Sequence, residues 1–294
     1  SGEKPYRFNW QTPILLSSHN QDILYMGSEF LQRSMNQGET WERISGDLTN
    51  GAKEGNVAFG TISTISESKF QFGLLYAGSD DGKIHVSKDG GVSWQLISGN
   101  LPQNLWVSRV VASSHKKERV YVTLNGYRND NFESYAYVSE DFGATWTSIS
   151  NGLTQAVNVI VEDSANENIL YVGTDNGLFI SVDKGANWQD FSNGMPKVAI
   201  HDAVIQTKAK ELIVGTHGRS IYKMDISKVQ ELTKDVLAKN LHLFKVNDRT
   251  KSERWGSQNY AWGKPSEPSQ TIWFYSNADG IVNVSITNEA GMLV

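Results

Sequence analysis

Short runs in which apolar and polar residues alternate recur along the first 226 residues of the chain. Each unit opens with such a run, for example residues 61–65 or 158–161, and a polar turn follows it. A second run then ends in a small residue, as at residues 75–78, and two more runs complete the unit. Because a period of two is typical of β-strands, each unit predicts four short strands that are joined by tight turns.

An octapeptide of the form Ser-x-Asp-x-Gly-x-Thr-Trp lies between the third and fourth runs of four units. Asn36 replaces the aspartate in the first copy, and Asn187 replaces the threonine in the last. The four tryptophans are separated by 53, 52 and 42 residues, which is about the length of one propeller blade. Since a four-stranded sheet cannot bury both faces alone, the repeat predicts an all-β fold, a β-propeller with four-stranded antiparallel blades.

The residue types of the octapeptide favour a structural role over a metal site. An Asp or Asn side chain accepts backbone N–H bonds within its own turn, glycine adopts a positive φ without steric cost, and tryptophan packs a large ring between the third and fourth strands. Calcium needs six or more oxygen ligands, so we expect no metal, and no motif predicts a cofactor. The structural set comprises Asn36, Gly38, Trp41, Asp89, Gly91, Trp94, Asp141, Gly143, Trp146, Asp183, Gly185 and Trp188.

Five blades are visible in residues 1–226, and the fifth differs from the others. Residues 198–226 predict only three strands and contain no octapeptide. The segment 6–10 could supply the missing strand and close a five-blade ring. Alternatively, upstream blades of a longer chain complete a larger ring, and this question stays open at the level of the sequence.

After residue 226 the pattern changes. Residues 227–246 predict a helical connector, because Ser227 can cap a helix whose apolar residues recur at helical spacing. Residues 247–268 predict an irregular segment. Residues 271–275 and 281–286 flank an Asn-Ala-Asp-Gly turn, which is a hairpin signal. We therefore expect residues 247–294 to begin an Ig-like β-sandwich that continues in a longer chain.

Composition narrows the classes of partner. The net charge is −5 and no Lys/Arg-rich run occurs, which argues against nucleic-acid binding. No apolar run approaches the ~20 residues of a membrane span. There is no cysteine, so disulfides and thiolate chemistry are excluded. Nine Trp, eleven Tyr and eleven Phe supply large side chains for packing between sheets.

The octapeptide resembles the Asp-box, or bacterial neuraminidase repeat, of sialidases, sortilin-type receptors and xyloglucanases. The rest of the chain is similar to large secreted bacterial proteins described as sortilin-like or as BNR-repeat glycosyl hydrolases. This likeness rests on residues 7–13, 106–110, 157–160, 173–179 and 214–221. It implies a secreted, periplasmic or cell-surface location, a ring that is often seven-bladed, and a β-sandwich downstream. The hydrolase label in that family largely follows the fold.

Strand order predicts where a ligand site lies. In an up-down blade the octapeptide turn is at one end, so the starts of the innermost strands converge at the other end, which we call the axial face. Aromatic, cationic and amide side chains there suit a sugar or peptide surface, although each one alone also fits blade packing, turn chemistry or an ion pair between blades. The ligand-binding candidates are Trp106, Arg109, Arg128, Asn158, His201, His217 and Arg219, and the catalytic candidates are Asp80, Asp130, Asp175 and Asp202.

We favour a binding propeller that presents its axial face to a glycan or a protein. The alternative is a glycoside hydrolase acting on a polysaccharide, which needs two carboxylates about 5–5.5 Å or ~6.5–9.5 Å apart, and a structural scaffold is the third hypothesis. Arg109, Arg128 and Arg219 could form the three-arginine cluster of a sialidase. However, the sequence has no Phe/Tyr-Arg-Ile-Pro motif and no marked Tyr–Glu pair, so a sialidase is not expected.

Overall fold

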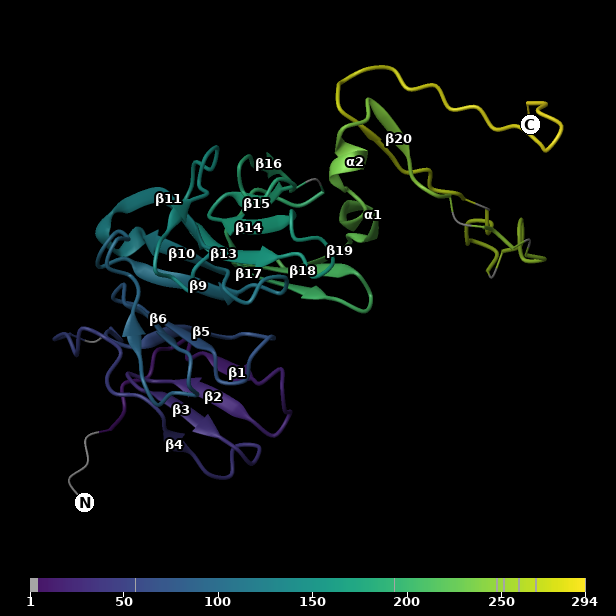
Figure 1. Cartoon of the computed structure of the whole chain (residues 1–294). Helices are drawn as coiled ribbons and strands as arrows, with labels where there is room; N and C mark the ends of the chain where they lie inside the picture. Colours follow the sequence, from purple (N-terminus) through teal and green to yellow (C-terminus); the bar gives the residue numbers. More distant parts are fainter. Residues whose placement is uncertain are drawn as a thin grey trace. The chain divides into compact units, whose positions relative to one another are not determined.

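A computed structural model describes residues 5–293, except residues 56, 193, 247, 251, 259 and 268. The predicted ranges 1–226 and 247–294 therefore include some residues that lie outside the described part. The chain divides into two units, Ser1–Ile226 and Ser227–Val294. The first unit consists of antiparallel sheets, and the second contains two short helices and one two-stranded sheet in its described residues (Figure 1).

The strands of the first unit form five blades in chain order, which we number 1 to 5. Blade 1 contains β1 (Ile14–Leu16), β2 (Leu24–Gly27), β3 (Leu31–Ser34) and β4 (Glu42–Arg43). Blade 2 contains β5 (Ile62–Glu67), β6 (Leu75–Ser79), β7 (Ile84–Ser87) and β8 (Gln95–Leu96). Blade 3 contains β9 (Trp106–Ala112), β10 (Val120–Gly126), the 3-10 turn η1 (Tyr127–Asn129), β11 (Asn131–Ser139) and β12 (Thr147–Ser148). Blade 4 contains β13 (Val157–Glu162), β14 (Leu170–Thr174), β15 (Gly177–Ser181) and β16 (Gln189–Asp190), and blade 5 contains β17 (Ile200–Gln206), β18 (Glu211–Thr216) and β19 (Ile221–Asp225).

The strands of each blade pair in sequence order, so the predicted four-stranded antiparallel units are confirmed in blades 1 to 4. Blade 5 has three strands, as expected from the missing octapeptide. The first strands of successive blades contact one another, from β5 through β9 and β13 to β17, which makes them the innermost strands. The ring does not close within the described residues, because no strand pairs with the outer edge of β19.

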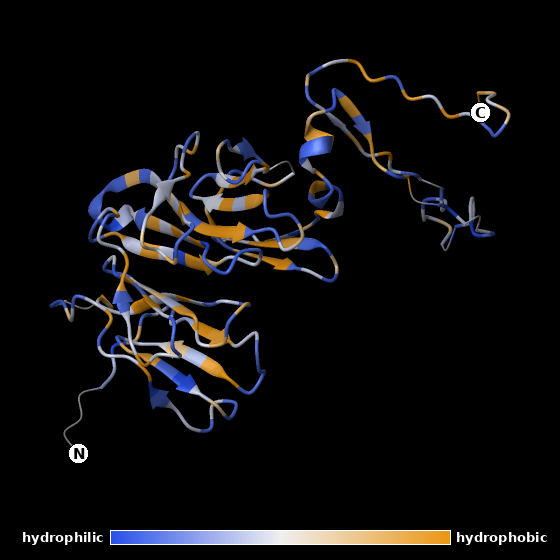
Figure 2. Ribbon diagram, viewed as in Figure 1, coloured by the Kyte–Doolittle hydropathy of each residue, from blue (hydrophilic) through white to orange (hydrophobic). Residues whose placement is uncertain are grey.

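The hydrophobic cores of the first unit lie between neighbouring blades. One core joins blades 1 and 2, a second joins blades 2 and 3, and a third joins blades 3 and 4. Figure 2 shows the matching pattern, with apolar residues concentrated on the strands and polar residues at their ends. Burial of these faces supplies the main driving force for stacking the blades.

The octapeptides form hydrogen-bonded turns between the third and fourth strands. In the third copy, Ser139 Oγ donates to Asp141 Oδ1 at 2.7 Å, and the backbone N–H of Thr145 donates to the same oxygen at 2.8 Å. The backbone N–H of Gly143 donates to Ser139 Oγ at 2.7 Å, and the glycine has a φ of +89°. The other copies repeat this geometry, with Asn36 Oδ1 as the acceptor in the first.

These hydrogen bonds make the turns sensitive to acid. The hydroxyl and backbone N–H of Ser93, with the hydroxyl of Ser87, lower the pKa of Asp89 from 3.8 to about 2. A carboxyl whose pKa is depressed on folding contributes stability above its unfolded pKa and loses it as the pH falls through the folded pKa. We expect the free energy of unfolding to fall more steeply from about pH 4 to pH 2 in the parent than in Asp89→Asn. Denaturant unfolding at several pH values measures this, and parallel curves would contradict it.

The octapeptide tryptophans join one blade to the previous one, so they do more than pack between two strands. Trp94 Nε1 donates to the carbonyl of Ile44 at 2.9 Å. Trp146 and Trp188 repeat the contact with the carbonyls of Ile97 (2.8 Å) and Ile149 (2.6 Å). Each acceptor lies three residues after the tryptophan of the preceding blade. We call this contact the Trp–Ile joint.

A second contact between blades lies at the end that carries the octapeptide turns. It joins a tyrosine of one blade to a glutamate of the next. Tyr25 Oη donates to Glu67 at 3.0 Å, and Tyr121 Oη donates to Glu162 at 3.0 Å. Ala112 occupies the equivalent position of blade 3, one residue before its turn. The hydroxyl of Tyr76 in blade 2 is consequently buried without a partner among the described residues.

This difference predicts opposite outcomes for two identical substitutions. Tyr121→Phe should cost about 1–2 kcal/mol, because it removes a buried hydrogen bond to a carboxylate. Tyr76→Phe should leave stability unchanged or raise it slightly, because it removes a buried hydroxyl that has no partner. Urea unfolding of both variants measures the difference. Equal losses in the two would contradict the assignment of the tyrosine–glutamate contact.

Of the two alternatives that the sequence leaves open, closure of a five-blade ring by residues 6–10 does not occur. The segment forms no strand, and it is held against blades 1 and 2. The side-chain amide of Asn9 donates to Thr61 Oγ1 at 3.0 Å and to Asp80 Oδ2 at 3.3 Å. Arg7 pairs with Asp47 at 2.7 Å. These contacts hold the segment as a strap over the start of blade 2 and keep it from pairing with β19.

The second unit differs from its prediction in two places. The single helix is instead α1 (Ser227–Gln230) and α2 (Lys234–Leu237), because Thr233 is extended and its hydroxyl caps a new helix at Val236 N. The predicted hairpin is also wrong. Strand β21 (Phe274–Ser276) pairs with β20 (Leu241–Leu243), while residues 281–286 form no strand. A sandwich in this region stays an expectation.

Candidate functional site

The axial face is built from the starts of the first strands and the loops between second and third strands. The octapeptides lie in the turns β3–β4, β7–β8, β11–β12 and β15–β16, at the other end of each blade. Because neighbouring strands are antiparallel, the first strands begin at the end away from those turns. The innermost position of these strands therefore brings their first residues together.

Four of the first strands carry a β-bulge at the same register. The pairing shifts between Ile62 and Thr64 in β5, and equivalent shifts occur in β9, β13 and β17. A bulge inserts one extra residue and redirects its side chain. The extra residues are Ser63, Ser108, Asn158 and His201.

The bulge residues serve two different purposes. Ser63 Oγ donates to the carbonyl of Val107 at 2.7 Å, and Ser108 Oγ donates to the carbonyl of Val157 at 2.9 Å, so both tie their blade to the next. The amide of Asn158 instead bonds to side chains. It accepts from Asn125 Nδ2 at 2.7 Å and donates to Asp175 Oδ1 at 2.8 Å. A chain of polar side chains thus runs from blade 3 across blade 4.

The bulge residue of blade 5, His201, lies beside His217 with ring centroids 5.1 Å apart. Partial enclosure lowers the pKa of His201, His217 lowers it further, and Asp175 opposes the shift. The lowered pKa favours the neutral imidazole, which offers one donor and one acceptor. The structure therefore brings together the candidates Asn158, Asp175, His201 and His217.

A side-chain ion pair connects blades 3 and 5 past blade 4. Arg109 Nη2 lies 2.6 Å from Asp202 Oδ1, and the two side chains are 31% and 67% exposed. Arg109 Nε is buried without a hydrogen-bond partner among the described residues. An exposed ion pair is worth only about 0–1 kcal/mol, so a ligand can compete for either group.

Trp106 and Arg128 form a separate group beside blade 2. The Arg128 guanidinium lies 4.1 Å from the centre of the Trp106 ring, so one face of the indole is covered. Arg128 Nη1 also lies 3.7 Å from Asp80 Oδ2. Asp80 has a fully buried side chain, and burial raises its pKa against the opposing hydrogen bonds of Thr61. Asp80 therefore anchors the strap and the start of β5, and it is not placed to act on a ligand.

The remaining candidates and some unexpected neighbours lie on exposed loops. The side chains of Asp130 and Arg219 are exposed and have no partner among the described residues. Tyr127 in η1 and Phe132 at the start of β11 are 49% and 56% exposed. Tyr127, Phe132 and Asn125 are not among the ligand-binding residues that the sequence predicts.

No group of three or more His, Cys, Asp or Glu side chains in the described part of the chain could hold a metal ion. Within the same residues, no helix is long and apolar enough to cross a membrane. An open hollow of about 670 Å³ lies in the second unit, lined by residues such as Phe274, Asn277 and Asp279. It contains none of the axial candidates.

Comparison with known proteins supports the architecture. Residues 29–156 match the Sortilin-Vps10 family model, described as sortilin, neurotensin receptor 3. No curated protein matches the chain. A GH74 enzyme from Niastella koreensis is 23% identical over 72% of this chain and 36% of its own, with a TM-score of 0.54. The GH74 xyloglucanase from Xanthomonas campestris is 16% identical over 76% of this chain and 37% of its own, with a TM-score of 0.57.

A β-propeller domain from Myceliophteria thermophila is 12% identical over 78% of this chain and 69% of its own, with a TM-score of 0.55. The chain spans about a third of the length of the GH74 structures. At such identities these likenesses establish the fold alone. Together with the octapeptide turns, they show an Asp-box β-propeller whose fold resembles that of GH74 glycoside hydrolases and whose residues 29–156 are similar to the sortilin family.

Proposed function

We propose that this chain is a binding propeller and that its axial face takes up a glycan across blades 3 to 5. The observation that carries this proposal is the change of role at the bulge positions. Serines there bond to the backbone of the next blade, whereas Asn158 and His201 contact other side chains at the axial face. Fold stability alone does not require these larger side chains, because serine already forms the interblade contact twice.

The chemistry at this face suits a sugar. The chain from Asn125 through Asn158 to Asp175 offers directional donors and acceptors of the kind that hydroxyl groups need. The exposed rings of Tyr127 and Phe132 supply flat apolar surface nearby in blade 3. A protein ligand would use the same surface, and it is the other outcome of the binding test below.

Binding is favoured over hydrolysis by the surroundings of the carboxylates. Asp80 is buried, Asp202 is paired with Arg109, and Asp130 lies apart on a loop. The glycoside hydrolase alternative therefore depends on Asp175 together with Asp202, and Asp202 would first have to leave its ion pair with Arg109. One structural neighbour is named a xyloglucanase, but an identity of 16% carries the fold and not the substrate.

We also propose that the chain works within a larger secreted or cell-surface protein, with further blades upstream and a β-sandwich downstream. The sequence resemblance implies this setting, and the match to the sortilin family model supports it. If the chain shows no binding to any glycan or protein and no turnover of any glycan, the structural scaffold is the hypothesis that remains.

The proposal predicts that Asn158→Ser and His201→Ser weaken ligand binding while the fold remains. Serine at either bulge is the residue that blades 2 and 3 use, so we expect little change in stability. Loss of the side-chain contacts should weaken glycan binding about tenfold to a hundredfold. A glycan array identifies the ligand, and calorimetric titration of the bound oligosaccharide measures both variants.

The matched control is Asn151→Ser, because the Asn151 amide bonds to Ala186 in the fourth octapeptide turn. This variant should bind as the parent does. If the bulge variants also bind like the parent, the site is not where we place it. Release of reducing sugar that is lost in Asp175→Asn would establish the hydrolase alternative instead.

A further inference from the structure

Asparagine followed by glycine is the sequence at which a side-chain amide is most easily lost in water. Asparagine is a thermolabile residue, and a following glycine has no Cβ to shield its backbone nitrogen from the asparagine Cγ. The chain contains five such pairs, which begin at Asn50, Asn125, Asn151, Asn176 and Asn193. Asn193 lies outside the described residues, so the surroundings of four pairs can be compared.

The pair at Asn50 is held by hydrogen bonds at both reactive groups. The side-chain Nδ2 of Asn50 donates to the carbonyl of Asp81 at 3.3 Å, and its backbone N–H donates to the Asp81 carboxylate at 2.7 Å. The N–H of Gly51 donates to Thr49 Oγ1 at 3.0 Å. Attack of the glycine nitrogen on the asparagine side chain would first have to break these contacts.

The pairs at Asn125 and Asn176 are held by the strands beside them. Asn125 is 6% exposed, and its Nδ2 donates to Asn158 Oδ1 at 2.7 Å. Gly126 is the last residue of β10, and Gly177 is the buried first residue of β15. Both glycines pair with a neighbouring strand, so the backbone reaches a reactive geometry only through local opening of a sheet.

The pair Asn151–Gly152 lacks this protection. Both residues are exposed, and they form the corner of a turn in which the N–H of Leu153 donates to the carbonyl of Ser150 at 3.0 Å. The N–H of Gly152 donates to no described residue, and a Cβ there would meet no atom within 4 Å. The Asn151 amide makes one hydrogen bond among the described residues, of 3.4 Å to the carbonyl of Ala186.

We propose that Asn151 deamidates spontaneously and is the fastest site of this modification among the four pairs. The Gly152 nitrogen bonds to Asn151 Cγ, the bond from Cγ to Nδ2 breaks, and the amide leaves as ammonia with the proton of the glycine nitrogen. Water then opens the cyclic imide at one of its two carbonyls, which gives aspartate or isoaspartate. Water is the only co-reactant, and no oxidation or reduction occurs.

The place of this turn gives the modification a structural consequence. Isoaspartate routes the backbone through the former side chain and so lengthens the turn between Ile149 and Leu153. The carbonyl of Ile149 accepts the Trp188 indole N–H at 2.6 Å, and Leu153 is 8% exposed in the core between blades 3 and 4. Either product also replaces an amide donor with a carboxylate beside the Ala186 carbonyl. Modification therefore loosens the Trp–Ile joint between blades 3 and 4.

The corresponding turn of blade 2 is a matched reference within the same chain. It has the reversed order Gly99-Asn100, and the N–H of Leu101 donates to the carbonyl of Ser98 at 3.1 Å. Asn100 is exposed, as Asn151 is. The residue that follows Asn100 is a leucine, whose side chain shields the backbone nitrogen, so Asn100 should react far more slowly.

The test incubates the folded chain in mildly alkaline buffer and follows each asparagine by peptide mass spectrometry, with synthetic peptides to separate aspartate from isoaspartate. We expect Asn151 to convert about tenfold or more faster than Asn50, Asn125, Asn176 and Asn100. In urea the four Asn–Gly pairs should convert at similar rates, because the fold no longer protects any of them. If Asn151 converts no faster than the other Asn–Gly pairs in the folded chain, the proposal is overturned.

Hydrogen exchange of the Trp188 indole N–H, measured by NMR before and after incubation, tests the consequence for the joint. We expect this exchange to become about fivefold or more faster, while Trp146 in the joint between blades 2 and 3 is unchanged. The control Asn151→Ser has no amide to lose, so incubation should leave its Trp188 exchange unchanged. Unchanged exchange in the modified parent would overturn the effect on the joint. Faster exchange in the incubated control would overturn it as well, because another change would then be responsible.

Discussion

Replacing Glu162 by alanine should lower the free energy of unfolding by about 3–5 kcal/mol. The Glu162 carboxylate is buried and accepts hydrogen bonds from Ser113 Oγ at 2.8 Å and Tyr121 Oη at 3.0 Å. Arg119, itself 5% exposed, lies 3.5 Å from it. Removal of the carboxylate leaves two hydroxyls and part of a buried guanidinium without their acceptor, and their desolvation is no longer offset.

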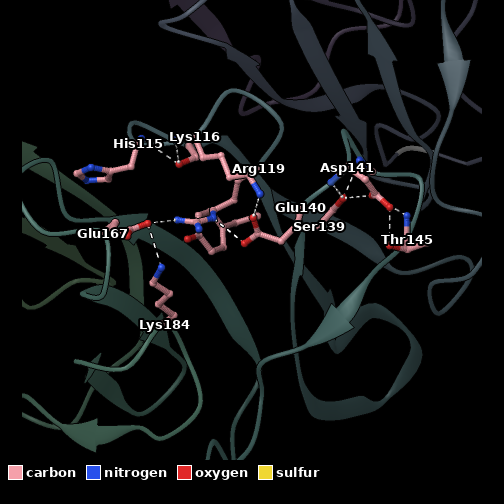
Figure 3. A network of polar contacts seen from close by, with 12 residues as sticks. His115, Lys116, Arg119, Ser139, Glu140, Asp141, Thr145, Glu167 and Lys184 are labelled. Atoms are coloured by element: carbon pink, nitrogen blue, oxygen red, sulfur yellow. Dashed lines mark hydrogen bonds and ion pairs between the residues drawn. The ribbon is translucent and has the colours of Figure 1, made fainter. Parts of the chain in front are cut away.

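The control for this prediction is Glu167→Ala, in the same network (Figure 3). Glu167 bonds to Arg119 at 3.1 Å and Lys184 at 3.0 Å, but its side chain is 44% exposed. Solvent can replace these contacts, so we expect a loss of at most about 1 kcal/mol. Denaturant unfolding compares the two variants, and equal losses would show that burial does not set the strength of this network.

The second large effect is expected for Gly143→Ala, at about 3–4 kcal/mol. Alanine at a φ of +89° costs about 1–2 kcal/mol. Its Cβ would also lie 2.4 Å from Ile97 Cδ1, and relief of such overpacking typically costs a further ~1–3 kcal/mol. Both the backbone cost and the overpacking cost arise at the Trp–Ile joint between blades 2 and 3.

Gly38→Ala separates the two terms. Gly38 has the same place in the octapeptide and a φ of +93°, but a Cβ there meets only ordinary contacts at 3.7 Å. It should lose only the backbone term, about 1–2 kcal/mol. Thermal or urea unfolding of both variants gives the difference. If the two substitutions cost the same, the glycine serves its own turn only and not the contact between blades.

The sequence predicts the blades well because each depends on local signals. Strand alternation and the octapeptide repeat within about 50 residues, and the turn residues Ser139, Asp141 and Gly143 bond to one another within five positions. The absence of an octapeptide from residues 198–226 likewise predicts that blade 5 lacks a fourth strand. The axial face also follows, because it depends only on strand order.

Contacts between distant residues could not be predicted from the sequence. The strap residue Asn9 reaches Asp80 across 71 positions, and Arg109 reaches Asp202 across 93. No local pattern identifies such partners, so Asp80 looked like a surface carboxylate. The bulges are also invisible in a single strand, since they exist only in the register between two. The bulges bring together the side chains around Asn158. The sequence predicts these residues as candidates, but it does not predict which of them contact one another.

The second unit shows the limit of short patterns. Residues 241–243 look like the end of a helix, yet they form β20 and pair with β21. The segment 281–286 has stronger strand alternation but no strand partner within the described residues. Three-residue strands are set by what packs beside them, and propensity decides little at that length.

The central claim is that ligand binds at the axial face of blades 3 to 5, opposite the Asp-box turns. Hydrogen–deuterium exchange with mass spectrometry, with and without the glycan identified on the array, tests it most directly. We predict that protection appears at residues 125–133, 156–159, 174–177 and 199–202, and that the Asp-box turn at 139–146 is unchanged. Protection of the Asp-box turns instead, or of neither end of the blades, would contradict the account.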